Sequence, residues 1–211
     1  MSDHAPLRLR YDEGCLAAHA LNVVGDRWAL LVVRELMLVP KRFQMIRAGL
    51  PGVTAAVLTQ RLAQLQAADV LRHDKALGVY ALTASGQGLM PVLQAMCRWG
   101  AAHPGHDPHR FISPTALMIS MTAMIDVQAA RGLTLRAGFR SGRETFLQDL
   151  SDGVLHLSAD PDPQAGVMFE GSGNALAAAI YGPRRVGQAP GVAIQGDLGL
   201  AQSYVDLFRL R

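Results

Sequence analysis

The sequence predicts a multidomain protein, in which a mainly α-helical domain is followed by a smaller α+β domain. A length of 211 residues allows two small domains. The first half alternates amphipathic helical stretches with breakers, whereas the second half holds short apolar segments bounded by Gly, Asp, Ser and Pro. Residues 101–115 contain three prolines and no periodicity. We therefore predict domains at residues 1–105 and 115–211, joined by a linker at 106–114.

The composition is that of a globular protein, with 50% hydrophobic and 18% charged residues. The net charge of +3 is unevenly placed, because residues 1–110 hold 12 Lys or Arg against 8 Asp or Glu, and residues 111–211 hold 8 against 9. This excess permits a phosphate-contacting surface in the first half without proving one. Two cysteines indicate no disulfide framework, and neither a leader nor a membrane-spanning stretch is evident. We expect a cytoplasmic protein without membrane contact.

The first half predicts a succession of helices and one hairpin. Residues 15–24 have helical spacing, and a second helix follows Asp26 and ends before Pro40. The second helix is apolar nearly all round, which is typical of a central buried helix. A short helical stretch, a helix at 54–68 and a hairpin at 70–83 come next. A last helix is expected from near Ser85 through Pro91 to about residue 103.

The second half predicts mixed elements. A helix at 117–125 precedes four strands at 133–139, 144–150, 153–159 and 166–171. A helix at 172–182, a strand at 191–197 and a closing helix at 198–210 follow. This order is the reason for the α+β assignment.

The helix at 54–68 has one buried face and one face fitted to a DNA groove. Leu58, Leu62 and Leu65 share an apolar stripe, while the opposite face is small and neutral-polar. Glutamine can bind adenine in two places, alanine or threonine methyls can touch thymine, and flanking cations can anchor phosphates. The pattern alone is equally compatible with an ordinary surface helix. The residues predicted to contact DNA are Lys41, Arg42, Thr54, Ala56, Thr59, Gln60, Arg61, Gln64, Arg72 and Lys75.

The sequence of the first half resembles the HxlR-type family of winged helix-turn-helix regulators. The resemblance is carried by Cys15, VVGDRW at 23–28, LLVVREL at 30–36, KRFQMIRAGLPGVTAAVLTQRLAQLQAADVL at 41–71, YALTASGQGLMPVL at 80–93 and the triplet RWG at 98–100. It implies a DNA-binding homodimer formed by the first and last helices of this domain. It also implies that residues 54–68 are the recognition helix and residues 70–82 the wing.

Cys15 lies where many proteins of this family keep a cysteine, and some of them use it to sense electrophiles or oxidants. Sensing needs a thiolate and access to solvent. Asp12 and Glu13 oppose a thiolate, whereas Arg8 and Arg10 favour one. Free cysteine is otherwise a small buried hydrophobe. Cys15 is therefore a candidate redox sensor with structural packing as the alternative, and Cys97 is expected in the core.

The second half resembles a sterol-carrier-protein-2-like domain. The resemblance is carried by GVAIQGDLGLAQSYVDLF at 191–208, with DGVLHLSAD, GVMFEG and NALAAAIYG upstream in the same order. It implies a cavity able to hold a small apolar ligand. The predicted lining residues are Met118, Met121, Phe139, Phe169, Tyr181, Tyr204 and Phe208. The alternative is that these side chains simply fill a core.

Other sites receive little support from the sequence. His103, His106, Asp107 and His109 lie in the Pro/Gly-rich linker, so we predict no metal site there. Neither a phosphate-binding loop, a cofactor motif nor a nucleophile–base pair is readable, so we expect no cofactor and no enzyme. A transcription regulator is the leading prediction. A lipid or small-molecule carrier with a helix-turn-helix interaction module is the alternative, and an enzyme acting through the second half is the third possibility.

Overall fold

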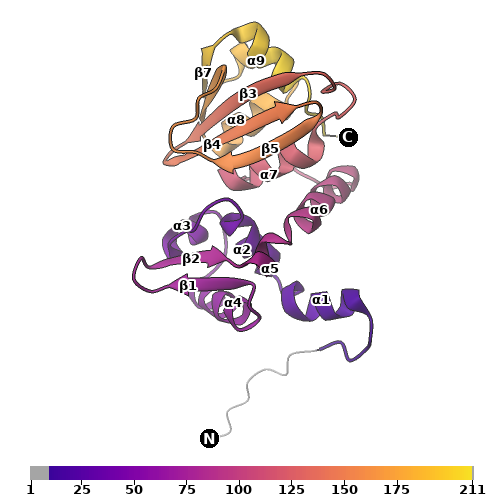
Figure 1. The fold of residues 1–211 in the computed structure, drawn as a ribbon, viewed down its shortest axis with the longest axis vertical. Helices are drawn as coiled ribbons and strands as arrows, with labels where there is room; N and C mark the ends of the chain where they lie inside the picture. The colour runs from indigo at the N-terminus through magenta and orange to yellow at the C-terminus, as the bar shows by residue number, and fades with distance from the viewer. Residues whose placement is uncertain (1–9, 211) are drawn as a thin grey trace, which may run out of the picture.

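The computed structural model describes residues 10–210, as two halves stacked along the long axis of the molecule (Figure 1). The first half comprises α1 (Leu16–Val24), α2 (Ala29–Leu36), α3 (Phe43–Ala48), α4 (Ala55–Ala67), β1 (Leu71–Asp74), β2 (Val79–Leu82), α5 (Ala84–Gln87) and α6 (Met90–Ala102). The second half comprises α7 (Pro114–Met124), β3 (Thr134–Ser141), β4 (Glu144–Ser151), β5 (Val154–Ala159), β6 (Val167–Gly171), α8 (Gly173–Tyr181), the 3-10 helix η1 (Val186–Gln188), β7 (Val192–Gly196) and α9 (Leu198–Val205). The predicted order, a helical winged helix-turn-helix half followed by an α+β half, is confirmed.

Local sequence signals set the starts of several helices. The hydroxyl of Thr54 accepts a hydrogen bond from the Val57 N–H at 3.3 Å and so caps α4. Ser113 caps α7 in the same way, through the Ala116 N–H at 3.1 Å, and Pro114 occupies the first turn, where no N–H is needed. The second helix starts later than expected, because Trp28 is its N-cap with a φ of 79°.

The single helix expected from near Ser85 to residue 103 is two helices. Thr83 caps α5 by accepting from the Gly86 N–H at 3.2 Å, and the helix ends at Gly88. The longer α6 then begins, with Pro91 in its first turn. The periodicity continues across the break, which is why the sequence pattern did not reveal it; glycine weakens the helix there.

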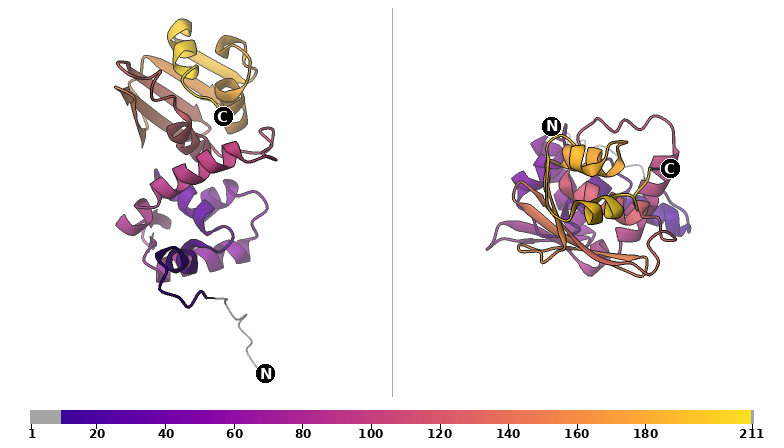
Figure 2. Two further views of the ribbon diagram at one scale, coloured as in Figure 1. Left: turned by 90° about the vertical axis from the view of Figure 1, so that its right-hand side faces the viewer. Right: turned by 90° about the horizontal axis from the view of Figure 1, so that it is seen from above.

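The second half is one five-stranded sheet in the order β5-β4-β3-β6-β7. Its strands pair antiparallel except β3 and β6, which run parallel with Phe139 opposite Phe169. Helices α7, α8 and α9 cover one face of this sheet (Figures 1 and 2). Along β4, Phe146, Gln148 and Leu150 are buried beneath the helices while the intervening residues are less so, as expected for a sheet with one covered face.

Each half has its own hydrophobic core, and α7 contributes to both. Leu117, Met118 and Met121 of α7 lie in the core beneath the sheet. Ile119 of the same helix lies in the first-half core, with the buried residues of α2 and α4. The helix is therefore buried from two sides and joins the halves into one packed body. Within residues 10–210, a single helix with the length and hydropathy of a membrane span does not occur; only α1 and α2 taken together, bent by 76°, pass that test.

Candidate nucleic-acid interface

The interface is built around α4, which lies on the side of the first half away from the five-stranded sheet (Figure 1). Leu58, Leu62 and Leu65 anchor the helix in the core with at most 2% exposure. The opposite face, with Ala56, Thr59, Gln60 and Ala63, is exposed together with the capping Thr54. The structure thus brings the predicted base-reading side chains onto one solvent-facing surface.

Exposed cations lie on other segments of the first half. Arg42 precedes α3, Arg72 lies on β1 and Lys75 in the hairpin turn, and all three are exposed. The turn is closed by the Asp74 carboxylate, which accepts hydrogen bonds from the Ala76 and Leu77 N–H groups at 2.9 and 3.1 Å. The hairpin is a short wing beside α4. Arg47, in α3, adds a further exposed cation.

The side chains of Arg61 and Gln64 bind other groups of the protein itself. The Arg61 guanidinium binds the Asp26 carboxylate and the Gln64 amide oxygen, and its side chain is only 12% exposed. Asp26 belongs to the turn between α1 and α2. Arg61 therefore fixes α4 against that turn in this structure, whereas both residues were predicted to contact DNA.

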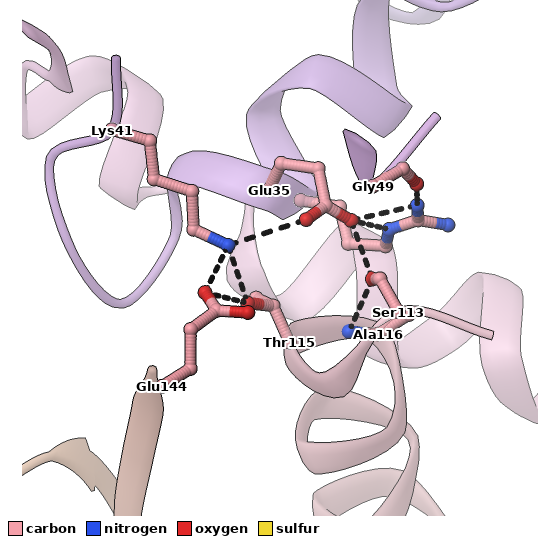
Figure 3. A network of polar contacts seen from close by, with 8 residues as sticks. Glu35, Lys41, Gly49, Ser113, Thr115, Ala116 and Glu144 are labelled. Atoms are coloured by element: carbon pink, nitrogen blue, oxygen red, sulfur yellow. Dashed lines mark hydrogen bonds and ion pairs between the residues drawn. The ribbon is translucent and has the colours of Figure 1, made fainter. Parts of the chain in front are cut away.

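The prediction that Lys41 contacts phosphate is wrong. Its side chain is 2% exposed, and its ammonium group forms ion pairs with Glu35, at 3.3 Å, and with Glu144 of β4 (Figure 3). It also donates a hydrogen bond to the Thr115 hydroxyl at 2.9 Å. A buried charge must be paired. Glu35, the single acidic residue of the largely apolar helix α2, was the sequence signal that a buried cation could be present.

The same network continues to the end of α3. The Glu35 carboxylate accepts hydrogen bonds from the Ser113 hydroxyl at 2.6 Å and from Arg34 at 2.8 Å. Arg34 also donates to the Gly49 carbonyl at 3.1 Å. A Cβ at position 49 would lie 2.3 Å from a Glu35 carboxylate oxygen, so a side chain there would displace the Glu35 carboxylate from this arrangement. We call Glu35, Lys41, Ser113, Thr115 and Glu144, with Arg34 and Gly49, the interdomain network.

The two cysteines differ in their surroundings. Cys15 is exposed at the N-cap of α1, so packing inside the single chain does not account for it. Cys97, on α6, is partly buried, and burial raises the pKa of its thiol. Whether Cys15 senses oxidants stays a prediction.

The predicted ligand pocket inside the second half is filled by its own side chains. Phe139 and Phe169 stack with their centroids 5.0 Å apart, and Tyr204 lies 6.3 Å from each ring. The Tyr204 hydroxyl donates to the buried Gln148 amide oxygen, and burial raises the pKa of this phenol. Met118 and Met121 are at most 1% exposed in the same core. Five of the seven predicted lining residues therefore fill the core, which is the alternative predicted from the sequence. The other two, Tyr181 and Phe208, border cavities at the edge of the core.

Comparison with known proteins identifies the first half. A family model described as HxlR-like helix-turn-helix matches residues 23–108. A helix-turn-helix transcriptional regulator of Methanothermobacter thermautotrophicus is 30% identical over 98 residues, which cover 44% of this chain and 75% of that protein. The regulator YodB of Bacillus subtilis is 33% identical over 85 residues, 38% of this chain and 76% of YodB. The chain belongs to the HxlR-like helix-turn-helix family of transcriptional regulators.

The HxlR-like regulator is also similar to solved structures. The quinone-bound YodB of Bacillus subtilis is 30% identical and covers 41% of this chain and 97% of that one, with a TM-score of 0.38. A structure described as a UbiJ-SCP2 ubiquinone synthesis protein is 16% identical over 57% of this chain and 84% of that one, with a TM-score of 0.32. A score this low supports no argument, so the sterol-carrier likeness of the second half stays a prediction. The residues of the HxlR-like regulator that match the family model, 23–108, all lie before α7.

Proposed function

We propose that this DNA-binding regulator is a cytoplasmic, non-enzymatic homodimer that binds an inverted-repeat operator and responds to a small effector held by its second half. The observation that carries the DNA-reading part is the exposed, neutral-polar face of α4, in a half that also exposes the cations Arg42, Arg72 and Lys75. Small side chains let the helix backbone approach base edges, and the cations anchor phosphates on either side.

Exposed apolar side chains on α1 and α6 support the dimer. Leu16 is 87% exposed and Leu21 49%, on a helix that buries only Ala18 and Val24. On α6, Met96 is 48% and Trp99 69% exposed. Large apolar side chains exposed on the surface of a helix often mark a protein–protein contact. A two-fold axis through this surface would present two copies of α4 to two half-sites.

The test is selection of binding sites from a random DNA pool, followed by titrations of the selected duplex. Gln60→Ala and Thr59→Ala should relax base preference, each costing about 1–3 kcal/mol at the selected site. Arg42→Ala should weaken binding to all sequences and reduce the slope of affinity against salt concentration by about 1. Arg143→Ala, in the exposed turn between β3 and β4, is the matched control.

Selection of inverted repeats supports both parts of the proposal. If the Arg42 and Gln60 variants bind every duplex like the parent protein, α4 is not the reading element. The alternative, a small-molecule carrier whose helix-turn-helix serves only in protein contacts, requires that the pool yields no enriched site.

A further inference from the structure

A cleft of about 1230 Å³ lies between the two halves, beneath the loop at 103–113 that joins α6 to α7. Its apolar wall includes Leu31 of α2, Leu93 of α6, Ile119 of α7 and Ala178 of α8. Ligand pockets in proteins have volumes of about 300–1,000 Å³ and mostly apolar walls. The cleft is therefore large enough for a ligand of ordinary size, and it is distinct from the filled core beneath the sheet.

Tyr181 is a neutral polar group in this wall. Its hydroxyl lies 2.9 Å from the Ser120 hydroxyl, and Ser120 donates its own proton to the Leu117 carbonyl at 2.8 Å. Tyr181 must therefore be the donor to Ser120. Burial raises the pKa of the phenol, so it stays uncharged at neutral pH. Tyr181 itself thus offers the ligand contact surface and a hydroxyl without a charge.

A second hollow of about 580 Å³ adjoins the cleft, and Tyr181 and Arg184 belong to both walls. This hollow is polar and carries Arg184, Arg185 and Arg209 against Asp206 alone. Within residues 10–210 none of these three arginines forms an ion pair. Three unneutralised guanidinium groups at the edge of an apolar cleft favour a ligand that has an apolar body and an anionic end.

We propose that the cleft and the adjoining hollow form one site for an amphipathic anion, such as an alkyl carboxylate or alkyl phosphate. The apolar chain lies between α6, α7 and α8, and the charged end lies among Arg184, Arg185 and Arg209. This inference deepens the proposed function: it gives the effector a chemical class and moves its site from the interior of the second half to the cleft between the halves. Its regulatory part rests on that function.

The site is placed to affect DNA binding. Arg34, Gly49 and Ser113 line the cleft and also belong to the interdomain network. These groups set the position of α3, and hence of α4, relative to α7. A ligand that changes the contacts of these groups shifts the equilibrium between different relative positions of the two halves. It alters the affinity for DNA only if it binds those conformations with unequal affinity.

The first experiment measures binding by the full chain. The sequence has two tryptophans, so Trp99→Phe leaves Trp28, which lines the cleft, as the fluorescent reporter. The probes are dodecanoate and dodecyl phosphate, with dodecanol and dodecyltrimethylammonium as uncharged and cationic controls, all below micellar concentrations. Both anions should change Trp28 fluorescence and raise the melting temperature, with affinities about tenfold or more above those of the two controls.

Two variants locate the site. Arg184→Glu/Arg185→Glu should lower the affinity for both anions about tenfold or more, whereas Arg131→Glu/Arg143→Glu, an equal charge change at exposed positions, should not. Ala178→Phe places a ring in the cleft without changing charge or adding a tryptophan, and it should lower the affinity for every probe. Melting temperatures close to that of the Trp99→Phe parent establish that each variant is folded.

The outcomes separate this inference from the proposed function. It is overturned if neither anion binds, if dodecanol binds as tightly as dodecanoate, or if the Arg184/Arg185 variant binds like its control. Dodecanoate should change the affinity of the unsubstituted chain for the selected operator, and it should have no such effect when Ala178→Phe is made in that chain. If no DNA sequence is selected, the proposed function fails while the fluorescence titrations still decide on the cleft. If DNA binds but the anions do not, the cleft fails alone.

Discussion

At the scale of single residues, Lys41 illustrates how a basic residue can be read wrongly from sequence. It stands beside Arg42 just before a helix of the DNA-binding half, and the pattern predicts two phosphate contacts. Arg42 is exposed, but Lys41 points inward to Glu35 and Glu144. The side chains of neighbouring residues point in opposite directions along extended backbone. Only the position of β4 in the fold shows that the Lys41 side chain ends beside Glu144.

Replacing Lys41 should therefore affect stability. Lys41→Met removes the shared partner of two carboxylates and leaves Glu35 at 1% exposure with Arg34 and Ser113 alone. Breaking a buried pair costs about 3–5 kcal/mol. We expect a loss of that size in the free energy of unfolding, measured by urea titration.

The exposed Lys75→Met serves as the comparison and should change stability by less than about 0.5 kcal/mol. At equal fractions folded, the slope of DNA affinity against salt should fall for Lys75→Met and stay unchanged for Lys41→Met. A Lys41→Met protein as stable as the parent would contradict the role given to the interdomain network.

At the scale of elements, periodicity and breakers predicted most helices and strands. The helix expected at 54–68 is observed as α4, Ala55–Ala67, because one apolar stripe and a capping threonine define it locally. The break at Gly88, the parallel pairing of β3 with β6 and the filling of the predicted pocket were not predictable in this way. Pairing order and cavity shape depend on contacts between segments far apart in the chain, which no local pattern records.

The helices α1 and α6 carry a prediction of their own. Leu16 and Trp99 on these helices are exposed. If a second copy covers them, their apolar surface is removed from water, which favours association. Leu16→Glu/Trp99→Glu should convert a dimer into a monomer at micromolar concentration in light scattering, because burying two carboxylates in an apolar contact is unfavourable. Val154→Glu, at a 54% exposed position on β5, should leave the mass unchanged. A parent protein that is already monomeric would exclude the proposed contact.

At the scale of the whole molecule, the two halves are joined by α7 and by the interdomain network. Ile119 packs into one core while Leu117 and Met121 pack into the other. Unfolding of either half then exposes apolar surface of the other, which couples their stabilities.

We therefore expect one cooperative unfolding unit. Native-state hydrogen exchange at increasing urea should show the amides of Val33 in α2 and Leu150 in β4 opening with the same free energy. Ile119→Ser should lower both values together. If Leu150 stays protected in urea that has already opened Val33, the halves are independent units, and the coupling of the cleft to DNA binding would lack its structural basis.

The five-stranded sheet has two unpaired edges, and both are short. The edge strand β5 is followed by Pro161 and Pro163, and β7 is preceded by Pro190. Free backbone groups along an edge invite strand-by-strand addition of further copies, which proline and short length oppose because the ladder cannot be extended. At high concentration the protein should therefore form discrete particles of fixed size, without the fibrous growth to which long open edges are prone.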